Sequence, residues 1–289
     1  MAHGAGYDVS RASQAVGLPL ITELVRFNGS REAANTTDTR HQHPFHQLDI
    51  VLDGSFEHVI EGRRLLTSRV RDAVLVPPLV RHHTRTRIGC WHASYKIYIT
   101  GPAADALGHR AFRFRLSREI FEVVRKAAQA WNESRPFAVE RVLAAAAMAI
   151  LEAMESAPKD RRQPPHGSAF RRQVLPLLVQ AETKPEAGWT VAELARKCSL
   201  SADHFSRLFR REFGENPKRF ILDSRMRFTA ALLAEEPDLS IKQIGEIACY
   251  STVQAFSRAF RQAFGTSPAA FRRHPGASRG PSRLISLRR

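Results

Sequence analysis

Hydrophobic and polar residues follow two different periods along this 289-residue chain. Between residues 20 and 100, short apolar runs alternate with turn residues, as where the run 48–52 precedes Asp53 and Gly54. An Asp-Gly pair after an apolar run is a strong signal of a β-hairpin. Many short strands separated by closely spaced turns are typical of a β-barrel or a jelly roll. We therefore predict a β-domain in this part of the chain.

The period changes to that of amphipathic helices between residues 117 and 156. Apolar side chains recur every three or four positions from Leu116 through Ile120 onward, which predicts a helix. A second helix is expected over residues 137–154, and its Ala-rich segment would let another helix approach closely. These two helices could cover the β-domain or form a dimer interface, and the pattern leaves both possibilities open.

Three segments contain little that a folded domain could bury. Residues 1–19 are expected to form a flexible arm, residues 157–168 a linker rich in Pro, Gly and charge, and residues 274–289 a disordered basic tail. Two domains remain, over residues 20–156 and 169–273. A chain of this length can bury a core in each of them.

One phrase of the second domain occurs twice, 51 residues apart: residues 205–217 and 256–268 share Phe, Ser, Arg, Phe, Arg, Phe, Gly and Pro in register. Each copy follows a shorter predicted helix and a tight turn, and the expected caps of the helices are Thr190, Ser201, Ser240 and either Ser251 or Thr252. Gly214 and Gly265 are expected to end the second helices in a left-handed conformation. Helix, turn and helix is the arrangement of a helix-turn-helix motif, so the repeat predicts two such motifs.

A long helix over residues 217–235 is expected to join the two motifs. It would span about 28 Å, at a rise of about 1.5 Å per residue. One turn of B-DNA is about 34 Å long. Two recognition helices separated by such a helix could therefore enter successive major grooves on one side of a duplex.

The second helix of each predicted motif has an apolar face and a polar face. On the polar face, Arg207 and Arg258 suit guanine and Gln254 suits adenine, because each can pair with two atoms of the base edge. The remaining arginines suit phosphates. Asp203 either accepts from a cytosine amino group or makes only a weak contact, since an acidic side chain repels phosphate. The candidate DNA-contacting residues from this pattern are Asp203, Ser206, Arg207, Arg210, Gln254, Ser257, Arg258 and Arg261.

Residues 170–273 resemble the DNA-binding domain of the AraC/XylS family of bacterial transcription regulators. The segments that carry the resemblance are 244–251, 256–261 and 264–272, which read IGEIACYS, FSRAFR and FGTSPAAFR. The resemblance implies RNA polymerase as a partner. It implies base contacts by Asp203, Ser206 and Arg207 in the first motif and by Val253, Gln254, Ser257 and Arg258 in the second.

Three residues depart from the family pattern. Gly245 stands where Ala is usual, Cys249 where Gly ends the first helix, and Thr229 where the joining helix usually has Ala. A left-handed backbone at Cys249 is expected to cost about 1 kcal/mol. Neither Gly245 nor Cys249 lies on the face that would read DNA, so we expect reduced stability rather than lost function.

Histidines gather at two places in the first domain, residues 41–46 and 82–83, in an order that resembles the cupin pattern of His-x-His followed by a later His. The resemblance implies a cupin-like barrel. Metal cupins also supply a carboxylate where this chain has Gln47, so we predict no metal or other cofactor, although imidazole is a good ligand and His41, His43 and His82 are candidates. The preferred interpretation is a pocket for an organic effector, bordered by His41, His43, Phe45, His46, His82 and Trp91.

Charge and cysteine content narrow the class of protein. The 44 basic and 28 acidic residues give a formal net charge of +16, which favours polyanionic partners, either nucleic acid or an anionic membrane. Three distant cysteines form neither a disulfide framework nor a metal-ligand spacing, which suits the cytoplasm. The sequence contains no signal segment and no long apolar run, so we expect no membrane insertion.

These patterns predict an α+β protein of two domains: a cupin-like β-barrel with two helices, then an all-α domain with two helix-turn-helix motifs joined by a long helix. The leading functional hypothesis is a dimeric, cytoplasmic transcription regulator that binds double-stranded promoter DNA under the control of a small-molecule effector. One alternative is a metal-dependent cupin enzyme fused to a DNA-binding domain, with metal at His41, His43, His46 and His82. Another is a DNA-binding protein without sequence preference. The sequence specifies neither the effector nor the operator.

Overall fold

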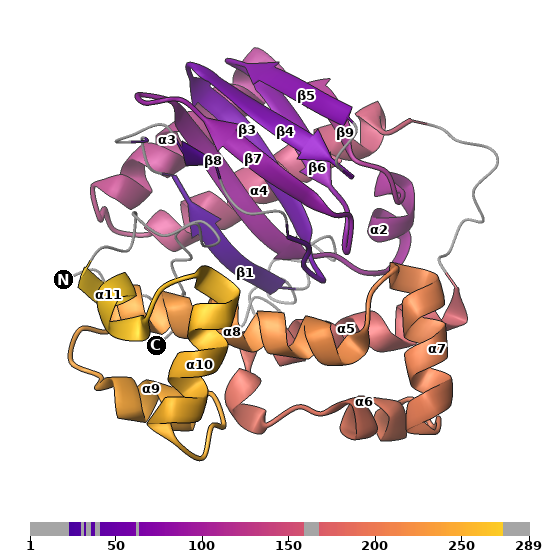
Figure 1. Ribbon diagram of the computed structural model, residues 1–289. Helices are drawn as coiled ribbons and strands as arrows, with labels where there is room; N and C mark the ends of the chain where they lie inside the picture. The colour runs from indigo at the N-terminus through magenta and orange to yellow at the C-terminus, as the bar shows by residue number, and fades with distance from the viewer. Residues whose placement is uncertain are drawn as a thin grey trace. The chain divides into compact units, whose positions relative to one another are not determined.

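The computed structural model describes residues 23–29, 32, 36–37, 41–61, 64–158 and 168–273. The predicted arm, most of the predicted linker and the predicted tail therefore lie outside the described residues. The chain groups into two compact units, which lie within Met1–Pro165 and His166–Leu284. The N-terminal unit is rich in strands and the C-terminal unit is helical, which confirms the predicted division into a β-containing half and a helical half (Figure 1).

The strands of the N-terminal unit form two sheets. The elements are β1 (Glu23–Asn28), β2 (Thr36–Thr37), β3 (His46–Asp53), β4 (Ser55–Ile60), β5 (Arg64–Arg69), β6 (Asp72–Val76), β7 (His82–Thr86), β8 (Trp91–Tyr98), α2 (Gly101–Leu107), β9 (Phe112–Arg115), α3 (Arg118–Asn132) and α4 (Ala138–Ser156). One sheet has the order β1-β8-β3-β6-β9 and the other β2-β7-β4-β5. The described strands thus pair as two separate antiparallel sheets, without the closed ring of a barrel. The chain crosses from one sheet to the other after β3, β5, β6 and β7, and the spacing of turns does not reveal these crossings.

One face of the five-stranded sheet is covered by helices α3 and α4. Side chains such as Leu48 and Tyr95 on this face are completely buried in one apolar core with Val124 of α3 and Ala146 of α4. The sequence left open whether the two helices cover the sheet or form a dimer interface, and their inner faces cover the sheet. The opposite face of the sheet meets the four-stranded sheet.

The C-terminal unit contains two helix pairs around a long helix. Its elements are α5 (Ala169–Thr183), a short 3₁₀ turn η1 (Pro185–Ala187), α6 (Val191–Lys197), α7 (Ala202–Phe213), α8 (Pro217–Glu235), α9 (Ile241–Ile247), α10 (Val253–Phe264) and α11 (Pro268–Arg273). Helices α6 and α7 form the first pair, α9 and α10 form the second, and α8 contacts both (Figure 1). The hydroxyl groups of Thr190, Ser201, Ser240 and Thr252 cap these four helices, as predicted. Gly214 and Gly265 end α7 and α10 with φ of 67° and 73°.

The turn inside each helix pair contains a residue in the left-handed conformation. Cys249 has φ of 60°, as expected from its place at the end of α9, and Ser199 has φ of 57° in the first pair. The first helices of the two pairs are offset by 50 residues and the second helices by 51. The second pair therefore contains one more residue between turn and helix, which the register of the repeated phrase did not show.

The two other departures from the family pattern are both buried. A Cβ atom added to Gly245 would lie 3.3 Å from side-chain atoms of Phe256, so the glycine lets α9 pack closely against α10. Thr229 is completely buried, and its hydroxyl group donates to the carbonyl oxygen of Met226 at 2.9 Å. An intrahelical bond of this kind satisfies a buried hydroxyl group without any partner from another helix.

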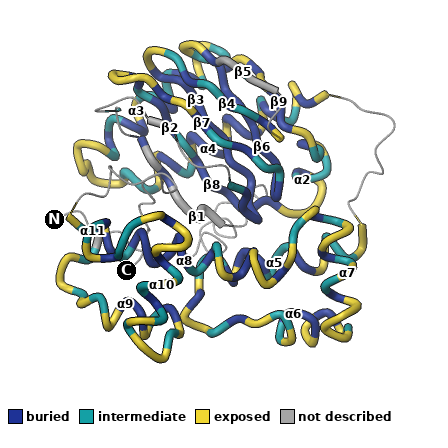
Figure 2. The backbone as a smooth tube through the Cα atoms, in the orientation of Figure 1, coloured by how far each residue is buried: buried dark blue, intermediate teal, exposed yellow. Residues whose placement is uncertain are grey.

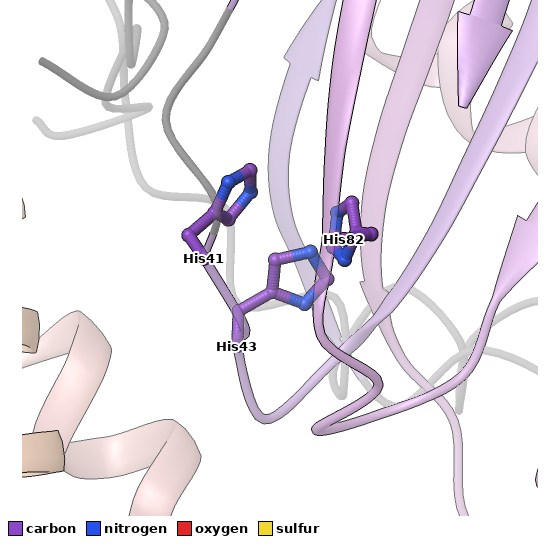
Figure 3. Close-up of side chains that lie close together, drawn as sticks. All are labelled: His41, His43 and His82. Carbon is purple, nitrogen blue, oxygen red and sulfur yellow. The ribbon is translucent and has the colours of Figure 1, made fainter. Parts of the chain in front are cut away.

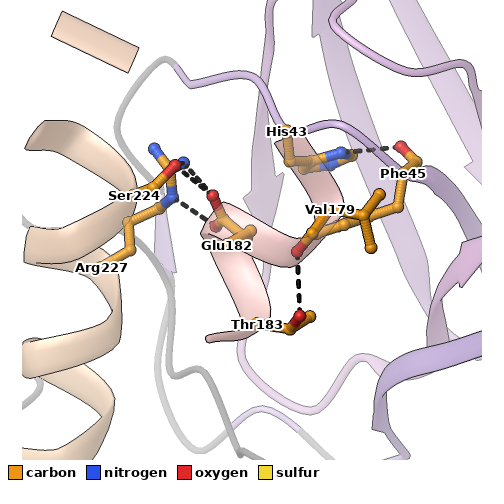
Figure 4. A network of polar contacts seen from close by, with 7 residues as sticks. All are labelled: His43, Phe45, Val179, Glu182, Thr183, Ser224 and Arg227. Carbon is orange, nitrogen blue, oxygen red and sulfur yellow. Dashed lines mark hydrogen bonds and ion pairs between the residues drawn. The ribbon is translucent and has the colours of Figure 1, made fainter. Parts of the chain in front are cut away.

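A buried ion pair joins α5 to α8 in the C-terminal unit (Figure 4). Arg227 donates from Nε and Nη2 to the two carboxylate oxygens of Glu182, at 2.9 and 2.7 Å, and the hydroxyl group of Ser224 also donates to Glu182. Both charged side chains are only 10% exposed. Burial by itself would lower the pKa of Arg227, but the Glu182 carboxylate outweighs it and raises that pKa.

The first prediction concerns this ion pair. Arg227→Met should destabilise the C-terminal unit by about 3–5 kcal/mol, because it leaves the Glu182 carboxylate buried without its partner. The double variant Glu182→Leu/Arg227→Met should recover most of that loss, since no unpaired charge remains. The measurement is urea unfolding followed by helical circular dichroism.

Arg219→Met is the matched control, because Arg219 lies on the same helix, is 76% exposed and pairs only with half-exposed Asp223. It should change the free energy of unfolding by less than about 0.5 kcal/mol. Equal effects of the Arg227 and Arg219 variants would contradict the structural role of the buried pair.

Candidate nucleic-acid interface and histidine cluster

Phenylalanine stripes fix the outward faces of α7 and α10. Phe205, Phe209 and Phe213 are buried along α7, and their rings contact one another edge to face or tilted. Phe256, Phe260 and Phe264 repeat the arrangement on α10. Because residues four apart lie on one side of a helix, these stripes turn the residues between them outward (Figure 2).

The predicted DNA-contacting residues lie on these outward faces. Asp203, Arg207, Arg210, Gln254, Arg258 and Arg261 are exposed, while Ser206, Val253 and Ser257 are half-buried at the edge of the same faces. Short helices α6 and α9 pack against α7 and α10 and hold them in place. Each unit thus presents one helix with arginines pointing away from its core.

The outward faces of the two helices differ in charge. Asp203 lies in the first turn of α7, where a negative charge interacts favourably with the helix dipole. The first turn of α10 contains no acidic residue and instead exposes Gln254. Asp203 therefore has a structural reason to occupy its position, in addition to any contact with a base.

A chain of polar groups lies between the two sheets of the N-terminal unit. Asp49 on β3 accepts hydrogen bonds from Nε2 of His58 on β4, at 2.6 Å, and from Nε2 of Gln47, at 2.7 Å. Burial by itself would raise the pKa of Asp49, but the hydrogen bonds outweigh it and hold that pKa well below its ordinary value. Asp49 is therefore ionised inside the protein. Sequence analysis missed this pair, although an aspartate inside the apolar run 48–52 signalled a buried charge that needs a partner.

Three of the predicted pocket residues gather at the end of this chain of polar groups (Figure 3). His41 and His43 lie on the segment before β3, and His82 begins β7. One potential ligand atom from each lies within 4.8 Å of the others. Burial, together with His82 and Lys96 nearby, lowers the pKa of His43 well below its ordinary value, so its ring is neutral at neutral pH.

The other three predicted pocket residues have different surroundings. Phe45 belongs to the same place, because its ring stacks on that of His43 with centroids 4.2 Å apart. His46 and Gln47 are successive residues of β3, so their side chains point to opposite faces of the sheet, and only Gln47 faces the histidines. Trp91 pairs with Asp53 at the far end of the β3–β8 ladder and packs with the core under the helices. The structure therefore does not bring Trp91 and the histidines together.

Comparisons with known proteins agree with the geometry of the helical unit. Residues 194–274 match the family model described as "Helix-turn-helix domain". The chain is 38% identical over 88 residues to the HTH-type transcriptional regulator AlkR of Acinetobacter baylyi, in a match that covers 30% of this chain and 28% of AlkR. It is 31% identical over 91 residues to a putative AraC-like transcription regulator of Streptomyces antibioticus, covering 32% of this chain and 30% of that protein. The chain thus spans less than a third of the length of these two relatives.

A solved structure resembles the described fold over most of its length. It is the unsaturated fatty acid bound form of ToxT from Vibrio cholerae, with a TM-score of 0.54 and 11% identity, covering 86% of this chain and 94% of ToxT. At this identity the likeness shows the fold alone, which is a two-domain fold with a strand-rich half and a helical half. The C-terminal unit is therefore a helix-turn-helix domain. It is a domain of the AraC type, as the resemblance of its sequence implied.

The structure was also searched for helices that could cross a membrane. Within the described ranges, no helix is both long and apolar enough to do so.

The second prediction concerns the buried carboxylate between the sheets. Asp49→Asn should destabilise the N-terminal unit by about 3 kcal/mol or more at pH 7, because it removes the charge that His58 and Gln47 hydrogen-bond. The folded-state pKa of Asp49 is lower than its unfolded value, so this stabilisation is complete above about pH 4 and is lost as the pH falls further. Calorimetric unfolding of the wild type and the variant between pH 3 and 7 measures the difference.

Asp53→Asn is the control, because Asp53 ends the same strand with an exposed side chain. It should leave the unfolding temperature almost unchanged at every pH. A variant of Asp49 that unfolds like the control, or a difference that grows towards low pH, would contradict the assignment of a buried, ionised Asp49.

Proposed function

We propose that this protein is a transcription regulator that binds promoter DNA through two helix-turn-helix motifs, α6–α7 and α9–α10. The observation that carries the proposal is the pair of capped helices, α7 and α10, each packed by a phenylalanine stripe and exposing arginines on its outer face. Helix α8 is 19 residues long, or about 28 Å. That length suits two helices that enter successive major grooves.

The two motifs read different base pairs in this proposal. Asp203, Ser206 and Arg207 face the bases from α7, and Val253, Gln254, Ser257 and Arg258 face them from α10. Arg210 and Arg261 contact phosphates, since both are exposed one turn further along their helices. Because one helix presents an acid with an arginine and the other a glutamine with an arginine, the preferred DNA site is asymmetric.

The N-terminal unit is the regulatory half in this proposal. Its two sheets are those of a cupin-like domain, and the fold is shared with ToxT, which has been solved in a form bound to an unsaturated fatty acid. That likeness supports a small organic effector bound in the N-terminal unit, and binding would bias how the helical domain meets DNA. The proposal makes the protein a cytoplasmic regulator that acts with RNA polymerase, and not an enzyme, because the relatives matched in the helical unit are named as regulators.

The outer face of α4 supports a dimer with a second copy of this chain. Its exposed positions include Met148 and Leu151, which are 37% and 45% exposed, and at the two ends of the same face are Arg141 and Glu155. Met148 lies midway between these two charges. If two copies of α4 pack antiparallel about Met148, Arg141 meets Glu155 of the partner subunit at both ends. The face is therefore complementary to itself in shape and in charge.

The third prediction concerns the reading of bases. Arg258→Ala should weaken binding to the preferred DNA site about 10- to 100-fold, as expected for loss of a bidentate contact worth about 1–3 kcal/mol. Binding to random DNA at the same salt concentration should fall much less. Arg125→Ala removes the same charge from α3 of the N-terminal unit and should change neither. Equal losses on both DNAs would exclude base reading by Arg258, and equal affinity of the wild type for all duplexes would favour binding without sequence preference.

The fourth prediction concerns the dimer. Arg141→Glu should weaken self-association, because it places like charges at both ends of the paired helices, and Arg141→Glu/Glu155→Arg should restore it. Leu151→Glu should abolish association, whereas Ile88→Glu, at a 65% exposed position of a loop, should have no effect. Sedimentation equilibrium measures each dissociation constant. A charge exchange that does not restore association would exclude this pairing of α4.

A further inference from the structure

His41, His43 and His82 are held together by backbone bonds as well as by their side chains. The N–H group of His41 donates to the carbonyl oxygen of His82 at 2.9 Å, and His82 returns the bond to His41 at 2.9 Å. The ring centroids of these two residues are 4.5 Å apart, and the ring of His43 lies 5.0 Å from that of His82 (Figure 3). The cluster is therefore built into the β-structure, in contrast to a chance meeting of surface side chains.

The hydrogen bonds of two of these rings fix which nitrogen carries the proton. Nδ1 of His43 lies 2.9 Å from the carbonyl oxygen of Phe45 (Figure 4), and Nδ1 of His82 lies 2.9 Å from that of Val80. A carbonyl oxygen only accepts, so each Nδ1 must carry the hydrogen and donate it. In a neutral ring, Nε2 is then a lone-pair acceptor.

The side chain of Gln47 presents a third acceptor to the same point. Its Nε2 donates to the Asp49 carboxylate at 2.7 Å. Because an ionised carboxylate only accepts, this bond fixes the orientation of the amide group, with Oε1 towards the histidines. Oε1 lies 2.8 Å from Nε2 of His43 and 3.4 Å from Nε2 of His82.

Three acceptor atoms that approach so closely repel one another unless a cation lies among them. A proton on one ring could fill this role only as a buried imidazolium, since His43 and His82 are 2% and 0% exposed. It would also lie close to the ammonium group of Lys96, which stands over the Phe45 ring that stacks on His43. A metal ion satisfies all the acceptors at once.

We infer that His41, His43, His82 and the amide oxygen of Gln47 bind a divalent transition-metal ion. Two ligands about 2.1 Å from an ion and separated by 2.8 or 3.4 Å subtend angles of about 84° and 108° at it, which lie close to octahedral and tetrahedral values. Imidazole nitrogens suit Zn, Cu, Fe and Ni, whereas Mg and Ca prefer sites made entirely of oxygen.

The surroundings of the four ligands are those of a metal site. Ligating histidines typically donate their second N–H group to a carbonyl oxygen or a carboxylate, which fixes the ring and raises its basicity. His43 and His82 make such bonds, and Asp49 orients Gln47 in the same way. The sequence predicted no metal because Gln47 replaces a carboxylate, but the amide oxygen faces the histidines and can take the place of that carboxylate.

The site does not depend on the proposed binding of DNA. An ion bound there would fix the segment that leads into β3 against the start of β7, since its ligands come from both. Its donor set has no charge of its own. We therefore expect an affinity lower than that of sites with carboxylate or thiolate ligands.

Cobalt binding to the full-length, untagged protein tests the inference. After treatment with a chelator, the protein should bind one Co²⁺ per chain, with absorption bands in the visible range, and Zn²⁺ should displace it. His43→Ala and His82→Ala should each weaken binding at least 10-fold, since even loss of a residue that only orients a ligand typically costs 10- to 100-fold. Gln47→Leu should weaken it as well.

His83→Ala is the matched control. His83 is the next residue of β7 and points to the other face of the sheet, so its removal should leave Co²⁺ affinity unchanged. Circular dichroism establishes whether each variant is folded. Loss of binding in the His83 variant equal to that in the His82 variant would overturn the site, as would absence of stoichiometric Co²⁺ binding in the wild type.

A second measurement requires no variant. X-ray absorption of the Zn²⁺-loaded wild type should show three imidazole ligands and one oxygen ligand, at about 2.0–2.2 Å. Sulfur ligands, or fewer than three imidazoles, would contradict the assignment even if every histidine variant failed to fold.

Discussion

Burial of the phenylalanine stripes on α7 and α10 is the interaction on which the helical unit depends. Phe205, Phe209, Phe256 and Phe260 are completely buried, and each contributes roughly 1.5–3 kcal/mol by leaving water. A helix has only one orientation about its axis that buries its whole stripe. The same burial that stabilises the domain therefore decides which side chains face outward, and the arginines of both helices lie on that outward face.

The left-handed turns and the joining helix place these two faces relative to each other. Ser199 and Cys249 reverse the chain within each pair, at a cost of order 1 kcal/mol for a residue other than glycine, and the Glu182–Arg227 pair fixes α5 against α8. The structural cost of the turns is offset by packing on both sides of them. The two motifs are equivalent in fold but not identical, since one residue separates their registers and their first turns present different side chains.

The N-terminal unit obeys a different constraint, because its interior between the sheets contains polar groups. A buried carboxylate must be hydrogen-bonded, and Asp49 meets this requirement through His58 and Gln47. The orientation thereby imposed on Gln47 extends to the histidines at the end of the sheets. A single buried charge on β3 thus determines what the cluster of His41, His43 and His82 presents to a ligand.

The sequence by itself determined the helical unit in detail: the repeated phrase, its four caps, the glycines that end α7 and α10, and the length of α8 are all local features. Local features are readable because hydrogen bonds of caps and periods of apolar residues involve neighbours along the chain. It did not determine how the strands pair, the Asp49–His58 pair, the separation of Trp91 from the histidines, or the direction of the Gln47 amide. These depend on contacts between residues far apart in the chain, such as β3 with β4 and β7, and only the tertiary structure decides which face of a strand meets which partner.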